Sequence, residues 1–567
     1  MAIAGVAGRY PKARDLGAFW ENLCNGIDSI SEIPASRWDH SDRTSCKWGG
    51  FIDGVDEFDP LFFNISPRDA ESIDPQARLF LQTAWHALED AGYSKSSLRQ
   101  RFAGRVGVFV GAMYNEYQLL SVTAGAISSP SLGSIANRVS YCLDLTGPSL
   151  SVDTSCSSSL TALHLAVESL RRRECDAAIA GGVNLSLHPV KYLAQAQLQM
   201  SSSSGRCRSF GAEADGIVPA EGVGAVLLKR HADAIADGDH IYGLIAGSTI
   251  NASGRTLGYT VPSPHSQAQL IADALRKSGV HPRAISYVEA HGTGTSLGDP
   301  IEIAGLTQAF REFTADRNFC SIGSLKSNIG NCEAAAGIAA LTKVLLQMKH
   351  RLLVPTLYAE TPNAAIDFDS TPFRLQQKTE EWRPCAVNPA APTARQPLLA
   401  AISSFGAGGA NAHVIVEECL QDADQPEQRD RPARPVVVVL SAKSTGQLVE
   451  QAANLLGVLD SGRIRESELE DVAYTLQVGR EALEERFACV GHSLTEICGH
   501  LRQLAQGAAR DGRIRRGTIQ PRLGAAEVVP GRDLQSALDS WAARGDWATI
   551  ADEWVKGADI PWARLHR

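Results

Sequence analysis

The chain lacks several features that would have placed it in a narrow class of proteins. Its 567 residues include 12 cysteines but no Cys-x-x-Cys pair, so neither a zinc ribbon nor a disulfide framework is indicated. The longest apolar stretch, near residues 334–348, contains Lys343 and is too short to cross a bilayer. No basic leader of a secretory signal stands at the start. We therefore expect a reduced, cytoplasmic compartment and no membrane partner.

An excess of positive charge is also missing. The formal net charge is −9, which argues against a nucleic-acid partner. Hydrophobic residues make up 44% of the chain and charged residues 21%, as in ordinary globular proteins. There is no tandem repeat and no low-complexity tract. Because Ile3–Gly8 reads as a strand and a glycine turn, the chain is expected to begin within a domain, as an excised fragment would.

What the sequence does contain is a long alternation of strand-like and helix-like segments. The alternation runs over residues 1–419 and predicts a layered α/β domain. Residues 420–435, rich in Asp, Gln, Arg and Pro, are expected to form a solvated linker. A small α/β subdomain is predicted over 436–567, beginning with the β-branched strand Val436–Leu440. Its apolar tail, Trp554–Trp562, is expected to pack back on a folded surface.

The segment Val152–Leu160, Val-Asp-Thr-Ser-Cys-Ser-Ser-Ser-Leu, puts a thiol where a strand is followed by a helix. A helix over Ser157–Arg173 is predicted by an apolar face made of Leu160, Leu163, Val167 and Leu170. A thiol at a helix N-terminus lies at the positive end of the macrodipole, which favours the thiolate. The alternative is that Cys156 is a buried cysteine that serves as a small hydrophobic residue.

A second candidate for chemistry is a histidine that directly follows a strand-like segment. Glu289–Thr295, Glu-Ala-His-Gly-Thr-Gly-Thr, comes after the predicted strand Ile285–Val288, so His291 is expected at a strand C-terminus, where α/β sites collect. The hydroxyls of Thr293 and Thr295 could contact a polar ligand.

The residues after this loop are expected to begin a helix. Asp299 at the N-cap, Pro300 at the first position and Glu302 at the third form a capping arrangement. For the two carboxylates, capping explains the pattern at least as well as catalysis does.

The segment Ser324–Glu333 ends a strand, turns, and leads into an Ala/Gly-rich helix near Ala334. Lys326 and Glu333 would be costly to bury unpaired, so we expect an ion pair between them.

The segment Ser403–His413 reads as a glycine turn between two strands. A phosphate-binding loop is excluded because Val414–Val416 is a strand, where such a loop needs a helix. The turn is better suited to presenting backbone N–H groups to a developing oxyanion, with His413 holding the turn.

Taken together, these segments resemble the β-ketoacyl synthase family, specifically the ketosynthase domains of modular polyketide synthases. The resemblance also includes the blocks Asp74-Pro75-Gln76, Asn137-Arg138-Val139-Ser140-Tyr141 and Ala214-Asp215-Gly216. Residues 436–567 resemble the flanking linker subdomain of such ketosynthases, through the run Ala473–Arg480. This subdomain and Gly258–Pro262 look most like assembly lines whose acyltransferase is a separate protein.

The resemblance implies a thiolase-like fold of five layers, αβαβα, built from two similar halves, with the small α/β flanking subdomain beside it. It also implies a homodimer whose partners are acyl carrier protein domains and neighbouring polyketide synthase domains. The substrate would arrive on the phosphopantetheine arm of the carrier, with no bound cofactor and no metal.

The resemblance assigns residue roles as well. Cys156 would attack the acyl thioester, and the backbone N–H groups of Cys156 and Phe405 would form the oxyanion hole. Thr293 and Thr295 would contact the phosphopantetheine arm. His291 would be the first of two histidines that stabilise the enolate formed when malonyl loses CO₂. The supporting residues would be Lys326 and Glu333, and Met113 and Tyr114 would line the acyl tunnel.

One position departs from this pattern in a way that matters for function. Where the family has Asn-Ile-Gly-His, the chain has Asn-Ile-Gly-Asn, which ends at Asn331. An amide can donate a hydrogen bond but cannot carry a positive charge or shuttle a proton. The loss of one good donor to a developing oxyanion costs ~10²–10³ in rate. The sequence therefore favours an enzyme that loads acyl chains on Cys156 without extending them.

Alternatives stay open from the sequence alone. A Cys156–His291–Asn331 set could still condense, as such sets do in the ketoacyl synthase III and chalcone synthase classes. The domain could also be an inactive docking and dimerisation scaffold. A degradative thiolase is disfavoured because Cys320 and Cys332 do not lie in that family's second-cysteine motif. Gly211 and Ala220 depart from the family's usual Asp and Gly, and the sequence offers no physical reason for either.

Overall fold

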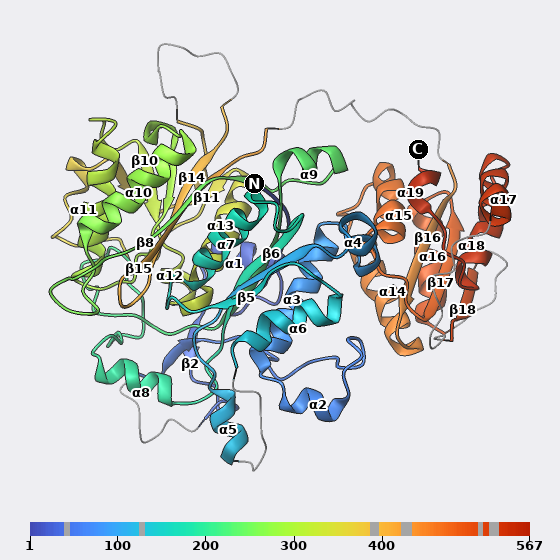
Figure 1. The fold of residues 1–567 in the computed structure, drawn as a ribbon, viewed down its shortest axis with the longest axis horizontal. Helices are drawn as coiled ribbons and strands as arrows, with labels where there is room; N and C mark the ends of the chain where they lie inside the picture. The colour runs from blue at the N-terminus through green and yellow to red at the C-terminus, as the bar shows by residue number, and fades with distance from the viewer. Residues whose placement is uncertain are drawn as a thin grey trace. The chain divides into compact units, whose positions relative to one another are not determined.

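The computed structural model describes residues 1–38, 46–123, 131–385, 396–420, 434–507, 514–520 and 532–566. The chain divides into two compact units (Figure 1). Unit 1 comprises Met1–Ala91 and Leu98–Leu420, and unit 2 comprises Gly92–Ser97 and Gln421–Arg567. Of the predicted linker 420–435, residues 421–433 lie outside the described residues.

Unit 1 is built on one 11-stranded mixed sheet. Its strands, in spatial order, are β12 (Phe373–Leu375), β10 (Cys320–Gly323), β9 (Tyr287–Glu289), β14 (Leu399–Phe405), β15 (Ala410–Glu417), β8 (Gly243–Ala252), β1 (Ala2–Arg9), β7 (Gly222–Lys229), β6 (Ala177–Asn184), β4 (Val106–Gly111) and β5 (Ser149–Val152). The strand predicted over Ile285–Val288 is observed over Tyr287–Glu289, after the 3₁₀ turn Pro282–Ala284.

The sheet contains the same pairing pattern twice. In the first half, β1, β7 and β6 pair antiparallel in that order, and β4 and β5 continue parallel from β6. In the second half, β8, β15 and β14 pair antiparallel, and β9 and β10 continue parallel from β14. β1 and β8 join the halves. The structure thus contains a duplication that is not visible in the sequence.

Helices complete a five-layer arrangement around these two halves (Figure 1). The buried helices α7 (Ser158–Arg171) and α13 (Ala336–His350) pack on each other and on strands of both halves, which makes them the central layer. The outer layers are formed by α3 (Pro75–Asp90) with α6 (Gly133–Leu143) on the first half, and by α10 (Pro264–Ser278) with α11 (Gly298–Arg311) on the second. The predicted apolar face of α7 is fully buried.

The remaining elements of unit 1 lie around this core. They are α1 (Leu16–Cys24), β2 (Ile30–Glu32), β3 (Trp48–Gly50), α2 (Pro67–Ser72), α5 (Tyr117–Thr123), α8 (Val190–Gln197), α9 (His231–Asp237), α12 (Lys326–Ile329), β11 (Leu352–Leu353), β13 (Glu380–Glu381) and the 3₁₀ turns η1 (Pro282–Ala284), η2 (Glu333–Ala335) and η3 (Phe368–Ser370). Helix α4 (Lys95–Phe102) contains the residues where the division into units falls. No helix in the described part of the chain has the length and apolar character that a bilayer crossing requires.

Unit 2 has a three-stranded antiparallel sheet of β16 (Val436–Ala442), β17 (Glu485–Gly491) and β18 (Ile514–Thr518). Its helices are α14 (Thr445–Asp460), α15 (Leu469–Val478), α16 (Leu494–Ala505), α17 (Arg532–Ala543), α18 (Trp547–Val555) and α19 (Trp562–Leu565), with the 3₁₀ turn η4 (Glu466–Glu468). One apolar cluster joins α14 and α16 to the sheet. A second cluster buries Trp554 and Trp562, from the C-terminal tail, against Val437 and Val439.

Candidate active site

Cys156 lies in a tight turn between the end of β5 and the start of α7. The preceding residue, Ser155, has φ +54°, a left-handed conformation that is costly for a non-glycine residue and persists only where the surroundings enforce it. Ser158 supplies that enforcement, because its hydroxyl accepts from Thr154 N at 2.9 Å and donates to Ser155 O at 2.6 Å. The turn thus holds Cys156, a partly exposed residue whose thiol is desolvated, at the N-terminal end of a buried helix.

The side chain of Asn331 faces this thiol. Its amide nitrogen, Nδ2, donates toward Cys156 Sγ at 3.6 Å. Its amide oxygen, Oδ1, accepts from the backbone N–H of Glu333 at 3.1 Å. Because the oxygen already has a backbone donor, the nitrogen of the amide points to the sulfur. Asn331 is 1% exposed, so the amide has no room to reorient without disturbing the core.

His291, Lys326 and Phe405 form a second group. The His291 ring packs edge-on against Phe405 with centroids 5.6 Å apart. Lys326 Nζ donates to His291 O at 2.6 Å and lies 3.4 Å from His291 Nδ1. An ammonium group can only donate, so Nδ1 is the acceptor and the ring proton sits on Nε2. Burial, with Lys326 adding to its effect, lowers the pKa of His291 well below its usual value, so the ring is a neutral donor.

Two buried carboxylates hold the loop that carries His291. Glu302 accepts from the backbone N–H groups of His291 and Gly292, each at 2.7 Å. Asp299 accepts from Phe210 N at 2.7 Å and from Gly294 N at 3.1 Å. Burial raises the pKa of Asp299 to about 6 and that of Glu302 to about 7.

The predicted capping arrangement is therefore wrong. Helix α11 begins at Gly298, one residue before Asp299, and its N-cap residue, Leu297, makes no side-chain cap. The acidic residues lie inside the first turn and reach back to accept from three N–H groups of the loop and from that of Phe210, all of which need acceptors. The sequence feature that could have indicated this loop-holding role is a pair of acidic residues, three positions apart, directly after a glycine-rich loop.

The predicted ion pair between Lys326 and Glu333 is also wrong. Glu333 instead pairs with Lys191 of α8 at 2.9 Å and accepts from Gln195 Nε2 at 2.5 Å. Lys191 is completely buried, and its ammonium also donates to Asn184, Leu185 and Ser186. Nothing in the local sequence of α8 distinguishes Lys191 or Gln195, because their partner lies 138 or more residues away.

The glycine turn after β14 interlocks with the Cys156 turn. Ser404 Oγ donates to Cys156 O at 2.7 Å, and Ser155 Oγ donates to Ala407 O at 3.2 Å. A Cβ at Gly406 would lie 2.2 Å from Thr154 O, so this close approach requires glycine. The structure thus brings Phe405 and Cys156, the two predicted oxyanion-hole residues, next to each other.

Thr293 and Thr295 lie together at the partly exposed end of the His291 loop. Their hydroxyl oxygens are 3.3 Å apart, and Thr295 Oγ1 accepts from Gly298 N at 3.1 Å. Gly294, between them, has φ +73° and accepts from Gly216 N at 3.0 Å.

The surroundings of Cys156 favour the thiol over the thiolate. Burial is the largest influence and raises the pKa of Cys156 above its usual range, and the nearby Glu333 raises it further. The Asn331 hydrogen bond and Lys326 lower it in part. The net direction is opposite to that expected from the helix N-terminus alone, because desolvation opposes any charge at this position.

Of the two unexplained departures from the family pattern, Gly211 has a packing reason. A Cβ at Gly211 would lie 2.4 Å from the Tyr358 carbonyl oxygen, as built on the present backbone. The methyl group of Ala220 faces Gly50 and Gly330, where an added Cβ at either glycine would crowd it, and nothing in the structure explains why Ala220 replaces the family's Gly. His413 is buried beside the turn, and its Nδ1 lies 3.0 Å from Ser403 Oγ. In the described ranges, no three His, Cys, Asp or Glu side chains are grouped so that they could hold a metal ion.

Comparison with known proteins decides the family. A model of the β-ketoacyl synthase N-terminal domain matches residues 1–234, and the C-terminal domain model matches residues 242–360. The ketosynthase from module 6 of the bacillaene synthase from Bacillus subtilis 168 superposes with a TM-score of 0.87 and 40% identity, over 100% of this chain and 95% of that one. The chain is a ketosynthase domain of the β-ketoacyl synthase family.

Further relatives agree with this assignment. The oxazolomycin ketosynthase domain OzmH KS7 from Streptomyces albus JA3453 has a TM-score of 0.87 and 45% identity, over 99% of this chain and 94% of that one. Polyketide synthase PksL of Bacillus subtilis (strain 168) is 49% identical, and polyketide synthase ThaG of Burkholderia thailandensis is 52% identical, both over 100% of this chain. The ketosynthase spans only 13% and 10% of those two proteins.

These matches confirm the predicted thiolase-like fold and membership of an acyl-transferring enzyme family. Residues 439–508 match the RhiE-like KS-MAT linker domain. The matches also confirm the resemblance to ketosynthases of assembly lines whose acyltransferase is a separate protein.

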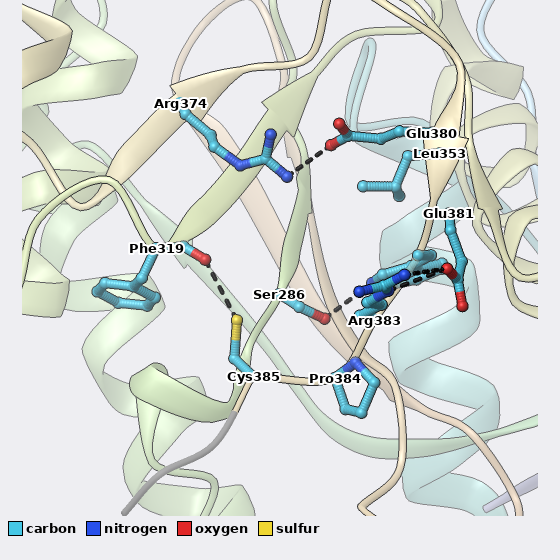
Figure 2. Close-up of a pocket in the computed structure, with 10 residues that line it drawn as sticks. Ser286, Phe319, Leu353, Arg374, Glu380, Glu381, Arg383, Pro384 and Cys385 are labelled. Atoms are coloured by element: carbon cyan, nitrogen blue, oxygen red, sulfur yellow. Dashed lines mark hydrogen bonds and ion pairs between the residues drawn. The ribbon is translucent and has the colours of Figure 1, made fainter. Parts of the chain in front are cut away.

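A pocket of about 430 Å³ elsewhere in unit 1 contains none of the predicted site residues (Figure 2). Two of its arginines are paired with glutamates: Arg374 with Glu380, and Arg383 with Glu381. Its thiol, Cys385, donates to Phe319 O at 3.2 Å. The candidate active site of the ketosynthase is therefore the group around Cys156 and His291, not this pocket.

Proposed function

We propose that the ketosynthase takes an acyl chain from an acyl carrier protein onto Cys156 and passes it on without extending it. The observation that carries this proposal is the Asn331 amide, which faces the thiol at 3.6 Å with its oxygen already bonded. An amide in that orientation supports thiol chemistry, but it cannot supply the charge or proton of an imidazole.

The loading step uses groups that are present together. Cys156 Sγ attacks the thioester carbonyl carbon of the incoming acyl group, a new S–C bond forms, and the proton of Cys156 leaves with the phosphopantetheine thiol. Backbone N–H groups of Cys156 and Phe405 stabilise the oxyanion, which the interlocked turns support. Thr293 and Thr295, at the partly exposed end of their loop, contact the phosphopantetheine arm.

The extension step makes a further demand. Malonyl on a second carrier must lose CO₂, and the enolate oxygen that forms needs strong donors. His291 supplies one through Nε2–H. The second position holds Asn331, and replacement of one good donor costs ~2.7–4 kcal/mol of barrier stabilisation, or ~10²–10³ in rate. Loading then survives while condensation becomes slow.

A two-carrier assay tests the proposal. The ketosynthase is incubated with acyl-loaded and malonyl-loaded carrier proteins, and mass spectrometry follows Cys156 and both carriers. We expect acylation of Cys156 and return of the chain to a free carrier, with no extended β-ketoacyl product. Cys156→Ala is the control for loading. Ready formation of the extended product would refute the claim that the ketosynthase does not extend the chain. Acylation that is unchanged in Cys156→Ala would refute the claim that Cys156 is the loading residue.

A second candidate is a condensing Cys156–His291–Asn331 set. It is favoured by the fixed amide, because a donor held in place before reaction stabilises an oxyanion more effectively than a mobile one. Asn331→His separates the two candidates. A gain of ~10² or more in extension favours the non-extending reading, whereas little change favours the condensing one. A silent scaffold, the third reading, requires that Cys156 also resist alkylation.

We also propose that the ketosynthase is a homodimer within a larger polyketide synthase, where carrier and neighbouring domains are its partners. Support comes from the edge strand β5, whose Leu150 is 46% exposed, and from Tyr141 of α6, which is 84% exposed. An exposed apolar edge strand is a template for pairing with a second strand. Sedimentation at micromolar concentration tests the dimer, and a monomer would contradict it.

A further inference from the structure

Behind Asn331 lies a buried network that the loading mechanism does not use. Glu333 donates its backbone N–H to Asn331 Oδ1, and its carboxylate is bound by Lys191 at 2.9 Å and by Gln195 at 2.5 Å. Lys191 and Gln195 are four residues apart, so they project from the same face of α8. All three side chains are less than a tenth exposed.

The backbone of Glu333 is strained in a way that serves this arrangement. Its φ is +47°, a conformation that costs a non-glycine residue of order 1–3 kcal/mol. The side-chain bonds to Lys191 and Gln195 hold the residue there. In this conformation the Glu333 N–H points at Asn331. The bonds from α8 to the Glu333 carboxylate therefore fix the direction of the Asn331 amide that faces Cys156.

The carboxylate also acts on the thiol through its charge. Two hydrogen bonds between buried groups join Glu333 N–H to Asn331 Oδ1 and Asn331 Nδ2 to the sulfur, and the charge of the Glu333 carboxylate raises the pKa of the Cys156 thiol in this buried region. There, charges interact more strongly than in water. Lys326 also acts on the thiol, and it contacts His291. Tyr114 interacts with the thiol as well, and Glu116, Asp153 and the Lys191 ammonium, 5.0 Å from its ring centroid, surround Tyr114.

We propose that Glu333 is a positioning residue for Cys156: its backbone N–H orients the Asn331 amide toward the thiol, and its carboxylate, gripped by Lys191 and Gln195, restrains thiolate formation. The resting enzyme then keeps a protonated, slowly reacting thiol. This inference rests on the proposed loading role of Cys156, but it concerns the thiol itself and can be measured without an acyl substrate.

The test is the pH dependence of Cys156 alkylation in the full chain. Iodoacetamide forms an S–C bond with Cys156 and releases iodide, and the thiol proton passes to solvent. The rate is followed by mass spectrometry of the peptide that contains Cys156. Glu333→Gln keeps the backbone donor to Asn331 and removes the charge. We expect alkylation at pH 7 to accelerate about threefold or more, with the rate midpoint moved to lower pH.

Two further variants make the result interpretable. The double variant Lys191→Met, Glu333→Gln removes both members of the buried ion pair and leaves no unpaired buried charge. It therefore takes over the test if Glu333→Gln alone fails to fold. Its midpoint should lie between those of the wild type and Glu333→Gln. Asp239→Asn is the matched control, because Asp239 forms an ion pair of 2.5 Å with a different buried lysine, Lys229 of β7. This variant should leave the alkylation profile unchanged.

An unchanged or raised midpoint in both Glu333 variants overturns the proposal, as does an equal shift in Asp239→Asn. Failure of acyl loading is a separate outcome, because alkylation reports the thiol whether or not a carrier protein is a substrate. A wild-type Cys156 that is alkylated normally but never acylated therefore refutes the proposed function and leaves the inference about Glu333 standing.

Discussion

The buried pair of Lys343 and Glu289 provides the sharpest test of how the site is held. Lys343 of α13 is 0% exposed, and its Nζ lies 2.8 Å from Glu289 Oε2 at the end of β9. The same carboxylate accepts from Leu325 N and from Tyr287 OH, each at 2.6 Å. It therefore fastens the strand that leads to His291 to the segment that leads to Lys326.

Lys343→Met removes the ammonium and leaves a buried carboxylate without its counter-ion. Breaking a buried pair in this way costs about 3–5 kcal/mol of unfolding free energy. Lys343→Met with Glu289→Gln should cost much less, about 1–2 kcal/mol, because the amide oxygen still accepts from Leu325 N while the unpaired charge is gone. The coupling between the two substitutions should thus exceed about 1 kcal/mol in the favourable direction.

The assay is denaturant unfolding followed by tryptophan fluorescence. Trp382 is a suitable reporter because it packs edge-on against Tyr287, with centroids 5.7 Å apart, and donates to Ser286. Suppose instead that the double variant loses as much unfolding free energy as the two single variants lose in sum. In that case the cost comes from lost packing rather than from the unpaired charge, and the reasoning is refuted.

Three further predictions follow from the same structure. Because burial raises the pKa of the Cys156 thiol, its alkylation rate should still be rising above pH 8.5, and a plateau at neutral pH would contradict this. The pKa of Glu302 is raised from 4.5 to about 7, so folded protein binds more protons than unfolded protein between these values, and stability falls as pH rises through that window. The stability margin of the wild type over Glu302→Gln should shrink by ~3 kcal/mol between pH 4.5 and pH 7 in thermal unfolding, and a constant margin would rule this out. Leu150→Lys at the exposed β5 edge should shift the dimer toward monomer in sedimentation while a similar change at the exposed Ile235 of α9 does not, and an intact dimer would remove β5 from the interface.

The sequence predicts those parts of the site that depend on local order. A strand, a turn and a helix in succession placed Cys156 at a helix start, and a glycine loop after a strand placed His291 at a strand end. The apolar face of α7 was readable because helix periodicity is local. These features need no knowledge of which strands are neighbours.

The partners of buried charges were not predictable in the same way. Glu333 pairs with Lys191, which is 142 residues earlier in the chain by subtraction of their numbers, and Lys326 binds the backbone of His291. Such pairs are set by which helix covers which loop in the folded unit. The carboxylates of Asp299 and Glu302 show the same limit, because a capping pattern and a loop-holding pattern are identical in sequence.

The duplicated sheet separates the proposed tasks between two copies of one pairing pattern. The nucleophile Cys156 follows β5 in the first copy, whereas His291 and Asn331 follow β9 and β10 in the second. The two copies meet at the interlocked turns, so a substitution in one copy leaves the strand, turn and helix of the other in place where it spares those contacts. An assembly line could lose chain extension by changing a single residue in the second copy, and keep the loading thiol as a relay point along the growing product.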